Sequence, residues 1–519
     1  MGQLLVGVDV GTGSARAGLF SARGESLGRA EQPIRLRRRS AREAEHDSGQ
    51  IWQAVGEAVQ AALAKAGAAP EDVAGIGFDA TCSLVLQGDK GAGVTAAPDG
   101  LANWDTVVWL DHRAIAEAAE CTATGDALLD SLGGVMSPEM QLPKLMWLKR
   151  HLPASWQAMT AAFDLADFLT HAASGSLARS ESTLACKWGW ADGWPTALLV
   201  RIGLADLIDK ANLPDAPTPP GADLGPLTPE AASALGLTPA TRVAAGLVDA
   251  HAGALGALGG DAASGERLCL IAGTSNSILA LAQDRRPIRG IWGPYRDAIL
   301  PGLWLLEAGQ SATGALLDHL VRAHPAGGEP TADRHAAIAA RIAELREQEG
   351  ARLAAHLHIL PDFHGNRAPL AEPDAFGVMS GLTLDDDFDS LARLYWRAAL
   401  AIALGVRQNL EALGAHGFAT DRLRLGGGHV KSPLLRQLYA DATGAAIELP
   451  RADAMLLGSA MLAAHAAGLY GSVAEAAAAM DQGYATIAPG PERHDRDYRA
   501  MLAMQRHRRE LEQIVREAE

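Results

Sequence analysis

Cysteines and long hydrophobic runs are scarce in this sequence, and both absences limit what the protein can be. Four cysteines occur among 519 residues, and no C-x-x-C pair or dense run of histidine and cysteine could form a zinc site. We therefore expect reduced thiols in a reducing compartment. No apolar stretch approaches about 18 residues, and no basic segment followed by an apolar stretch and a cleavage site opens the chain. These absences predict a cytoplasmic protein that has no membrane partner.

Basic residues are also fewer than acidic ones. The 45 lysines and arginines are outnumbered by 61 aspartates and glutamates, and the formal net charge is -16. Such a balance argues against a general polyanion-binding surface, so nucleic acid is not an expected partner. A local basic pocket for phosphate groups stays compatible with it.

Two common nucleotide-binding motifs are missing as well. The sequence contains no G-x-x-x-x-G-K-[ST] phosphate loop. Gly11-Thr12-Gly13 does not begin a dinucleotide fingerprint, because Arg16 stands where a third glycine is required and a strand, not a helix, is expected next. A nucleotide would therefore have to be bound in another way.

The chain is long, and helical and strand patterns alternate along it. A length of 519 residues exceeds what one core usually accommodates, so two large domains are expected. Residues 51–66 have apolar positions at helical spacing, and residues 73–78 then predict a strand. The proline- and glycine-rich residues 214–229 predict an irregular connection before a strand over 242–247. This alternation is typical of α/β folds.

One pattern of strand, glycine turn and strand occurs twice. Residues 4–10 form a short apolar run that ends in Gly11-Thr12-Gly13-Ser14 and is followed by a return strand. The same pattern recurs over residues 268–281 around a Gly-Thr-Ser turn. The repeat predicts two related domains, 1–258 and 259–519, that face one cleft.

Both turns could bind phosphate. Glycines let backbone N–H groups approach phosphate oxygens, and threonine and serine hydroxyls add donors. Asp9, at the end of the first strand, suits a magnesium ion held through water, because that ion keeps several waters and uses few carboxylates. The alternative is that Asp9 caps a hairpin turn. A third cluster, Gly426-Gly427-Gly428, could approach a nucleotide or form an ordinary strand-to-helix turn.

Together these motifs resemble those of the FGGY carbohydrate kinases over nearly the whole chain. The matching segments, in the family's order, are Gly7 to Gly13, Trp109 to Arg113, Gly246 to Gly253, Ala272 to Ser275, Gly365 to Pro369 and Gly426 to Gly428. The resemblance implies an α/β fold of two duplicated actin/hexokinase-like, ribonuclease H-like domains around a central cleft. It also implies ATP and Mg2+ as cofactors, a small sugar as substrate and, by analogy alone, a homodimer.

The same resemblance implies roles for individual residues. Asp249 would be the general base that takes the proton of the attacking sugar hydroxyl, which suits phosphoryl transfer. Without the family context, an N-cap aspartate would be the simpler interpretation. The implied phosphate and adenosine contacts are Gly11, Thr12, Gly13, Gly273, Thr274, Gly427 and Gly428. Arg16 could add positive charge to them or face solvent from its strand.

The segment from Asp79 to Ser83 resembles the sugar-facing segment of the ribulokinase branch, and that of D-ribulose kinases in particular. Asp79 and Cys82 are therefore candidate substrate contacts. Lys187 and Glu307 lie in segments similar to ribulokinase segments that touch the sugar, and a lysine donor with a glutamate acceptor suits a polyol. Without the resemblance, each would be interpreted as a solvated surface charge.

The choice of sugar rests on fewer residues. Ala80 stands where L-ribulose kinases usually carry an aromatic residue, which disfavours L-ribulose relative to D-ribulose. Ribitol and other pentitols present much the same hydroxyls and stay open as alternatives. The resemblance implies phosphorylation at the terminal C5 hydroxyl. Asp111 and His112 are weaker candidates that a structural ion pair would explain as well.

Two other classes share such a fold. The first is a nucleotide-driven conformational protein, such as an actin-like filament former or a heat-shock-type chaperone, and Asp249, Lys187 and Glu307 argue against it. The second is a non-catalytic protein that binds ATP and sugar. The presence of a base and two phosphate turns argues against that one.

Overall fold

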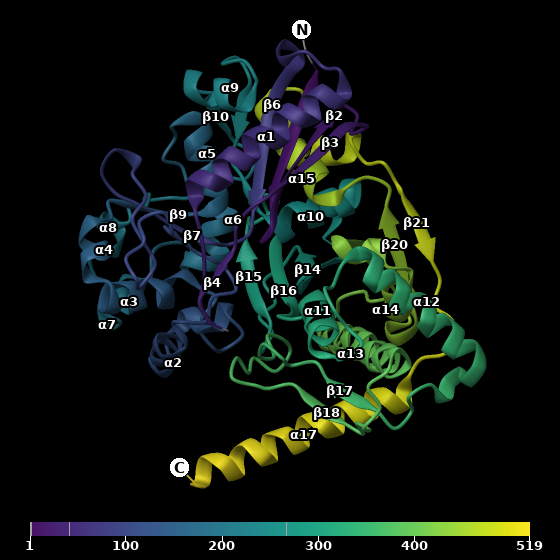
Figure 1. Ribbon diagram of the computed structural model, residues 1–519. Coiled ribbons are helices and arrows are strands. Elements are labelled where there is room, and N and C mark those ends of the chain that lie inside the picture. Colours follow the sequence, from purple (N-terminus) through teal and green to yellow (C-terminus); the bar gives the residue numbers. More distant parts are fainter. Residues whose placement is uncertain (1–2, 41, 266, 519) are drawn as a thin grey trace. The chain divides into compact units, whose positions relative to one another are not determined.

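The computed structural model describes residues 3–40, 42–265 and 267–518 (Figure 1). By their spatial contacts they form two compact units. Unit 1 consists of Met1–Arg267, Leu279–Leu306 and Pro450–Gly483. Unit 2 consists of Leu268–Ile278, Glu307–Leu449 and Tyr484–Glu519. The division of the sequence into a domain of residues 1–258 and a domain of residues 259–519 stays a prediction.

Unit 1 contains two sheets. The larger has seven strands in the order β10-β11-β6-β1-β2-β3, with β12 paired to β6. Its strands are β1 (Leu4–Val10), β2 (Ser14–Phe20), β3 (Ser26–Pro33), β6 (Val73–Ala80), β10 (Asp223–Pro226), β11 (Arg242–Ala244) and β12 (Leu247–Val248). The smaller has the order β4-β5-β8-β7-β9, formed by β4 (Arg37–Arg38), β5 (Ala44–His46), β7 (Leu84–Gln87), β8 (Thr106–Val107) and β9 (Ala161–Asp164).

Helices cover these sheets. They are α1 (Ser48–Ala66), α2 (Ile115–Ala123), α3 (Gln141–His151), α4 (Pro153–Ala158), α5 (Leu165–Ser174), α6 (Glu181–Thr183), α7 (Thr196–Arg201), α8 (Leu207–Lys210), α9 (Pro229–Leu235), α10 (Asp249–Leu258), α15 (Ala454–Ala466) and α16 (Val473–Ala479). Short helical turns are η1 (Pro70–Asp72), η2 (Asp89–Gly91), η3 (Ala127–Ser131), the π-helical η4 (Leu184–Trp188) and η5 (Gly259–Ser264).

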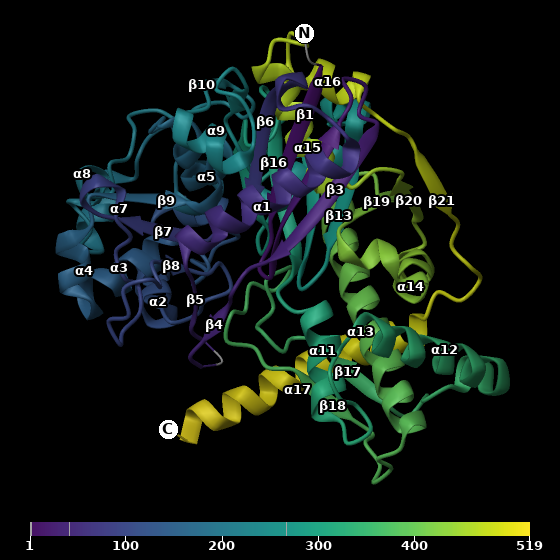
Figure 2. The same ribbon diagram turned by 45° about the horizontal axis from the view of Figure 1, so that its top comes forward.

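The helix predicted over residues 51–66 is confirmed as α1. It begins after Asp47, whose side chain accepts a hydrogen bond from the Gln50 N–H. The buried face of α1 packs on β2 and β3 (Figure 2).

The late helix α15 packs against β1, β6 and α10 of the same unit (Figure 1). Its backbone lies very close to the sheet: a Cβ atom on Gly7 would be 1.9 Å from the Leu456 carbonyl oxygen, and one on Gly77 would be 2.1 Å from that of Ser459. Any side chain at these two strand positions would displace the helix. Glycine is therefore required where β1 and β6 meet α15.

Unit 2 carries most of the second seven-stranded sheet, whose order is β15-β16-β14-β13-β19-β20-β21. The strands are β13 (Leu268–Ala272), β14 (Asn276–Ala282), β15 (Trp292–Arg296, in unit 1), β16 (Trp304–Gln310), β19 (Arg422–Gly426), β20 (Ala446–Pro450) and β21 (Tyr484–Ile487), and β17 (His358–Leu360) pairs with β18 (Val378–Ser380). The helices of unit 2 are α11 (Gly314–Ala323), α12 (Ala332–Glu349), α13 (Phe388–Gly414), α14 (Pro433–Thr443) and α17 (Asp495–Ala518), with η6 (Gly350–Arg352) and η7 (Gly428–Lys431). The predicted repeat of strand, turn and strand is confirmed: β1 and β2 flank the first turn, and β13 and β14 flank the second.

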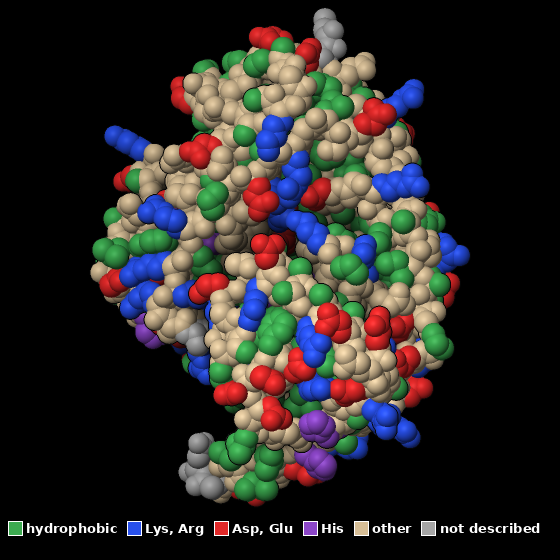
Figure 3. All heavy atoms as spheres, turned by 45° about the vertical axis from the view of Figure 1, so that its right-hand side comes forward, with side chains coloured by type: hydrophobic (Ala, Val, Ile, Leu, Met, Phe, Trp, Pro, Cys, Tyr) green, Lys and Arg blue, Asp and Glu red, His purple; other side chains and the backbone are tan. Residues whose placement is uncertain are grey.

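Some local predictions differ from the structure. The connection predicted as irregular over 214–229 contains the short strand β10, because Asp223 and Pro226 pair with β11. The strand predicted over 242–247 is divided into β11 and β12. All four cysteines are buried. Within the described ranges, no helix combines the length and apolar character that crossing a membrane would require. On the face shown in Figure 3, acidic and basic side chains are interspersed.

Candidate active site

Three aspartates follow one another along the carboxyl ends of neighbouring parallel strands in unit 1. Asp9 of β1 lies opposite Asp79 of β6, and Asp79 lies opposite Leu247 of β12, two residues before Asp249. In open α/β sheets, ligands bind at this edge. Asp9 and Asp79 are fully buried, whereas Asp249 is partly exposed. The sheet therefore brings together three carboxylates that the sequence predicted separately.

Burial and mutual repulsion govern the two inner carboxylates. Burial raises the pKa of Asp9, and the Arg16 guanidinium, whose NH2 lies 2.7 Å from Asp9 Oδ2, opposes that shift. Burial raises the pKa of Asp79 well above its usual value, and the charge of Asp9 raises it further. The Ser459 hydroxyl donates to Asp79 Oδ2 at 2.6 Å. Arg16 is thus an ion-pair partner of Asp9 and does not simply face solvent.

These carboxylates fit a magnesium ion by chemistry. Mg2+ prefers hard oxygen ligands and a small number of carboxylates. A divalent cation would also reduce the repulsion between Asp9 and Asp79. The predicted metal residue Asp9 therefore lies in suitable surroundings, and Asp79 lies beside it.

The first glycine turn is fixed by side chains from the smaller sheet. The Trp109 indole Nε1 donates to Thr12 Oγ1 at 2.9 Å, and the His46 Nε2 lies 3.1 Å from the Thr12 carbonyl oxygen. Gly13 is exposed, and a Cβ atom on it would meet nothing within 4 Å. Sequence analysis missed His46, which no motif marks, and used Trp109 only as part of a family segment.

Asp249 lies in the first turn of α10. Val248 is the N-cap residue, so the N-cap interpretation of Asp249 is wrong; its Oδ1 instead accepts from the Ala250 N–H at 2.7 Å. Ser182 supports this segment, because its Oγ accepts from the Val248 N–H at 3.2 Å and lies 2.7 Å from His251 Nδ1. Ser182 is in α6, directly before the π-helical turn η4, so one hydroxyl connects the two segments.

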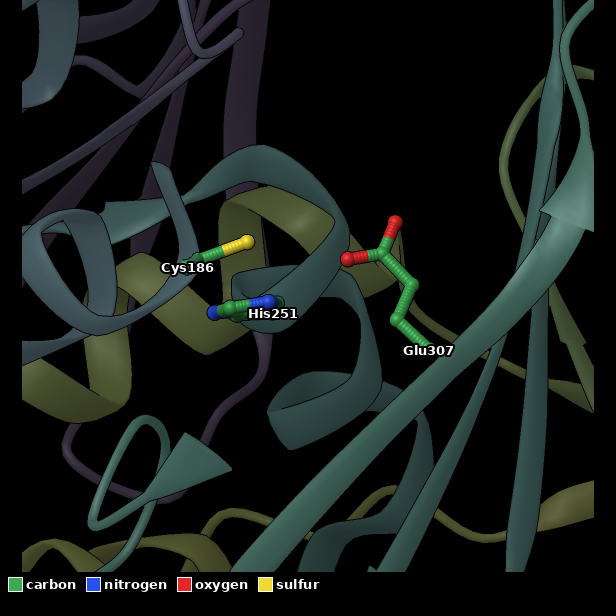
Figure 4. A group of neighbouring side chains, drawn as sticks. All are labelled: Cys186, His251 and Glu307. Carbon is green, nitrogen blue, oxygen red and sulfur yellow. The ribbon is translucent and has the colours of Figure 1, made fainter. Parts of the chain in front are cut away.

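Lys187 extends from η4 and is buried, with 5% of its surface exposed. Its Nζ lies 4.3 Å from the centroid of the Trp292 ring, a cation–π contact. Burial raises the pKa of the Cys82 thiol well above its usual value, and the charge of Lys187 opposes that shift. Figure 4 shows Cys186 of η4 and His251 of α10, which belong to the same unit.

Asp111 and His112 have structural partners. The Arg113 Nε donates to Asp111 Oδ1 at 2.8 Å, and the Ala44 N–H donates to Asp111 Oδ2 at 2.7 Å. His112 Nε2 lies 3.7 Å from Glu139 Oε1, and both side chains are buried. The structural ion pair proposed as the alternative for Asp111 is present.

In unit 2, the second glycine turn is bound by the start of α11. The Thr313 hydroxyl and the Gly314 N–H both donate to the Gly273 carbonyl oxygen at 2.9 Å, and the Thr313 N–H donates to the Thr274 oxygen at 2.9 Å. Because β13 and β19 are parallel neighbours, Gly427 lies beside this turn. It has a φ of 83°, and a Cβ atom on it would be 2.5 Å from the Ala272 carbonyl oxygen. Thr274 and Gly428 are exposed.

A buried histidine that sequence analysis missed connects the two glycine segments of unit 2. His429 directly follows Gly428; its Nδ1 lies 2.8 Å from the Tyr439 hydroxyl, and its ring forms a hydrogen bond with the backbone of Gly273. Burial lowers the pKa of His429 to about 4, so the ring is neutral near pH 7. The position of His429 directly after the glycine cluster was the feature of the sequence that could have predicted its role.

Glu307 of β16, labelled in Figure 4, is buried. The surface-charge interpretation is therefore wrong for Glu307, as it is for Lys187. Its Oε1 accepts from the Ser277 hydroxyl at 2.8 Å and lies 3.8 Å from Arg367 NH1. Arg367 belongs to the segment Gly365 to Pro369. That segment therefore supports the glutamate.

Matches to known families decide the identity of the fold. Residues 4–256 match the N-terminal domain of the FGGY family of carbohydrate kinases, and residues 268–467 match its C-terminal domain. The chain belongs to this family. The FGGY membership confirms the resemblance that the glycine turns and the Asp249 segment indicated.

Relatives of this FGGY chain include ribulokinases. A protein of Danio rerio named "FGGY carbohydrate kinase domain-containing protein" is 40% identical over 539 positions, and the match covers 98% of each chain. A D-ribulokinase of Saccharomyces cerevisiae is 35% identical over 517 positions, covering 89% of this chain and 71% of the yeast protein. The xylulose kinase of Rhodospirillum rubrum has a TM-score of 0.74 at 24% identity, covering 96% of this chain and 98% of its own. The predicted two-domain α/β fold is confirmed.

Proposed function

We propose that this FGGY kinase transfers the terminal phosphoryl group of ATP to a pentulose, D-ribulose, and forms D-ribulose 5-phosphate. The observation that carries the proposal is the place of Asp249, which follows β12 beside the carboxyl end of β6, together with the Ser182 hydrogen bond that joins Val248 to the segment directly before the turn that bears Lys187. A buried lysine with a partly exposed carboxylate nearby suits a polyol that must be bound and deprotonated. The similarity to a yeast D-ribulokinase supports the choice of sugar.

In the proposed reaction, the C5 hydroxyl oxygen of the sugar forms a bond to the γ phosphorus. The bond between that phosphorus and the β,γ-bridging oxygen breaks, and ADP leaves. Asp249 takes the hydroxyl proton, and its backbone contact with Ala250 limits the directions its carboxylate can take. Lys187 and Glu307 bind sugar hydroxyls, and Asp79 and Cys82 lie along the sugar segment.

We assign phosphate binding to the two glycine turns. Gly11, Thr12 and Gly13 offer N–H and hydroxyl donors in unit 1. Gly273, Thr274, Gly427 and Gly428 offer such donors in unit 2. Asp9 would hold Mg2+ through its waters, and the bound ion supplies charge neutralisation at the phosphate oxygens. Arg16 acts through its ion pair with Asp9.

A coupled assay of ADP release tests the proposal. Purified protein with magnesium and ATP is offered D-ribulose, L-ribulose, D-xylulose, ribitol and glycerol in turn. D-Ribulose is expected to give the highest kcat/KM, and Asp249→Asn to lower kcat by about 10²–10⁴-fold. Asp215→Asn, at an exposed position of unit 1, is the control and should keep full activity. Equal turnover with and without every sugar, from folded protein, would overturn the kinase proposal.

A further inference from the structure

We propose that His46 and Trp109 are positioning residues for the first phosphate turn, and that together they direct the donors of Thr12 and Gly13 toward a bound phosphate group. We call these two side chains the Thr12 clamp. The inference rests on the proposed function, because it takes ATP as the ligand of the turn. All of its residues belong to unit 1.

Trp109 determines what the Thr12 hydroxyl can do. An indole nitrogen has a hydrogen and no acceptor lone pair, so it can only donate. At 2.9 Å from Trp109 Nε1, Thr12 Oγ1 must be the acceptor of that bond. Its own hydrogen is left for another group, and within residues 3–40, 42–265 and 267–518 none accepts it. A phosphate oxygen, which only accepts, is a suitable partner for that hydrogen.

His46 determines the orientation of the next peptide group. The Thr12 carbonyl can only accept, so His46 Nε2, 3.1 Å away, carries the proton. Burial lowers the pKa of His46 to about 4, which keeps the ring neutral near pH 7, and the bond to the Thr12 oxygen selects the tautomer protonated at Nε2. In a trans peptide the N–H points opposite to the C=O. By binding the Thr12 oxygen, His46 therefore turns the Gly13 N–H to the opposite side, where Gly13 is exposed.

The clamp is connected to the sugar segment, which runs from the end of β6 in the larger sheet to the start of β7 in the smaller sheet. His46 ends β5, and Trp109 follows β8 by two residues. The Trp109 N–H donates to Ser83 Oγ at 3.2 Å, and Ser83 ends the segment predicted to face the sugar. The buried Lys144 Nζ of α3 donates to the Val108 and Trp109 carbonyls, both at 3.2 Å. The phosphate turn is thus connected through Trp109 to the sugar segment.

A double-mutant cycle tests the role of Trp109. The dissociation constant of Mg-ATP is measured by calorimetry, without sugar, on the full chain and on Trp109→Phe, Thr12→Val and the double variant. We expect about a fivefold weakening for Trp109→Phe and about twentyfold for Thr12→Val. The double variant should match Thr12→Val alone, because the indole acts through that hydroxyl. Multiplicative losses, or an unchanged constant in Trp109→Phe, would overturn the proposal.

A conservative pair tests His46. His46→Leu removes the donor and should weaken Mg-ATP binding about tenfold, whereas His46→Gln keeps an N–H and should recover most of that loss. The controls are Trp156→Phe and His171→Leu, which remove an indole bond to Asp206 and an imidazole contact with the Ser176 carbonyl elsewhere in unit 1. Neither should change the constant. Equal weakening in His46→Gln and His46→Leu at unchanged thermal stability would contradict the role.

The two proposals can fail separately. Nucleotide binding that follows the expected cycle, with no turnover on any sugar, would remove the kinase proposal and keep the clamp. Normal D-ribulose turnover, with losses in the double-mutant cycle that multiply, would remove the clamp and keep the kinase proposal. Wild-type protein that binds no Mg-ATP would overturn both.

Discussion

The two glycine turns have the same local form and different supports. In unit 1, the turn is fixed from the side by His46 and Trp109 of a separate sheet. In unit 2, it is fixed by Thr313 at the start of α11, which follows β16, and by His429. Each turn thus has one buried histidine bonded to its backbone, from unrelated places in the chain. The comparison shows that a repeated strand and turn does not specify the groups that rigidify it.

The glycine segments differ in the space around their backbones. Gly13 and Gly273, one in each turn, both have open space where a Cβ atom would be, whereas Gly427, beside the second turn, has a backbone oxygen there and a left-handed φ. The turns themselves therefore depend on their side-chain supports, while the segment at Gly427 is confined by backbone packing. Four tests, ordered by expected effect, would break or sharpen this contrast.

Gly427→Ala should have the largest effect. The alanine would combine a strained positive φ with a Cβ atom 2.5 Å from the Ala272 oxygen, and we expect a loss of about 4 kcal/mol in the free energy of unfolding. Urea denaturation followed by circular dichroism measures it. A loss below about 1 kcal/mol would show that the backbone of unit 2 is not confined there.

The two histidines should make stability fall with acid. The pKa values of His46 and His429 in the folded protein are about 4, below the usual 6.5, so each contributes stability that is present above pH 6.5 and is lost as pH falls through 4. Each should account for about 3 kcal/mol of the difference between pH 7 and pH 4.

The measurement compares urea midpoints at pH 7 and pH 4.5 for wild type, His46→Gln and His429→Gln. Other groups titrate equally in all three proteins, so a variant that loses less stability between pH 7 and pH 4.5 than wild type shows the contribution of its histidine. Both variants should lose less stability on acidification than wild type. If one variant loses as much stability between pH 7 and pH 4.5 as wild type does, its turn is not supported by a neutral ring.

Thr313→Val should have an intermediate effect that is confined to unit 2. It removes the hydroxyl bond to the Gly273 oxygen, which the Gly314 N–H still satisfies, so we expect about 1 kcal/mol less stability and a KM for ATP a few-fold higher. Thr443→Val removes a threonine bond to the Tyr439 carbonyl in the same unit and serves as the control. An unchanged KM with lowered stability would limit Thr313 to a structural role.

Gly13→Ala should have the smallest effect on folding. Its Cβ atom would meet nothing within 4 Å, so the free energy of unfolding should change by less than about 0.5 kcal/mol. Thermal denaturation of the apo protein tests this. A loss comparable to that of Gly427→Ala would mean that the backbone at Gly13 is confined as the backbone at Gly427 is.

Local patterns carried most of what could be predicted. The apolar runs before Gly11 and Gly273 predicted the repeated turns, and strand ends predicted the placement of Asp9 and Asp249. The ion pair of Arg16 with Asp9 was available from hairpin register, since the two residues lie opposite each other on β1 and β2. His46 and His429 were missed because their contacts depend on how separate strands come together, and a single sequence does not encode that locally.

The position of α15 has a consequence for the order in which the protein can form. Its residues are among the last hundred of the chain, yet their backbone lies against Gly7 and Gly77 in the first two parallel strands of unit 1. During synthesis those strands emerge first and stay without this cover until residue 466 has left the ribosome. Domains generally fold as units from the N-terminus. Here the N-terminal sheet must wait for nearly the entire message to be translated, with its apolar face in need of temporary protection.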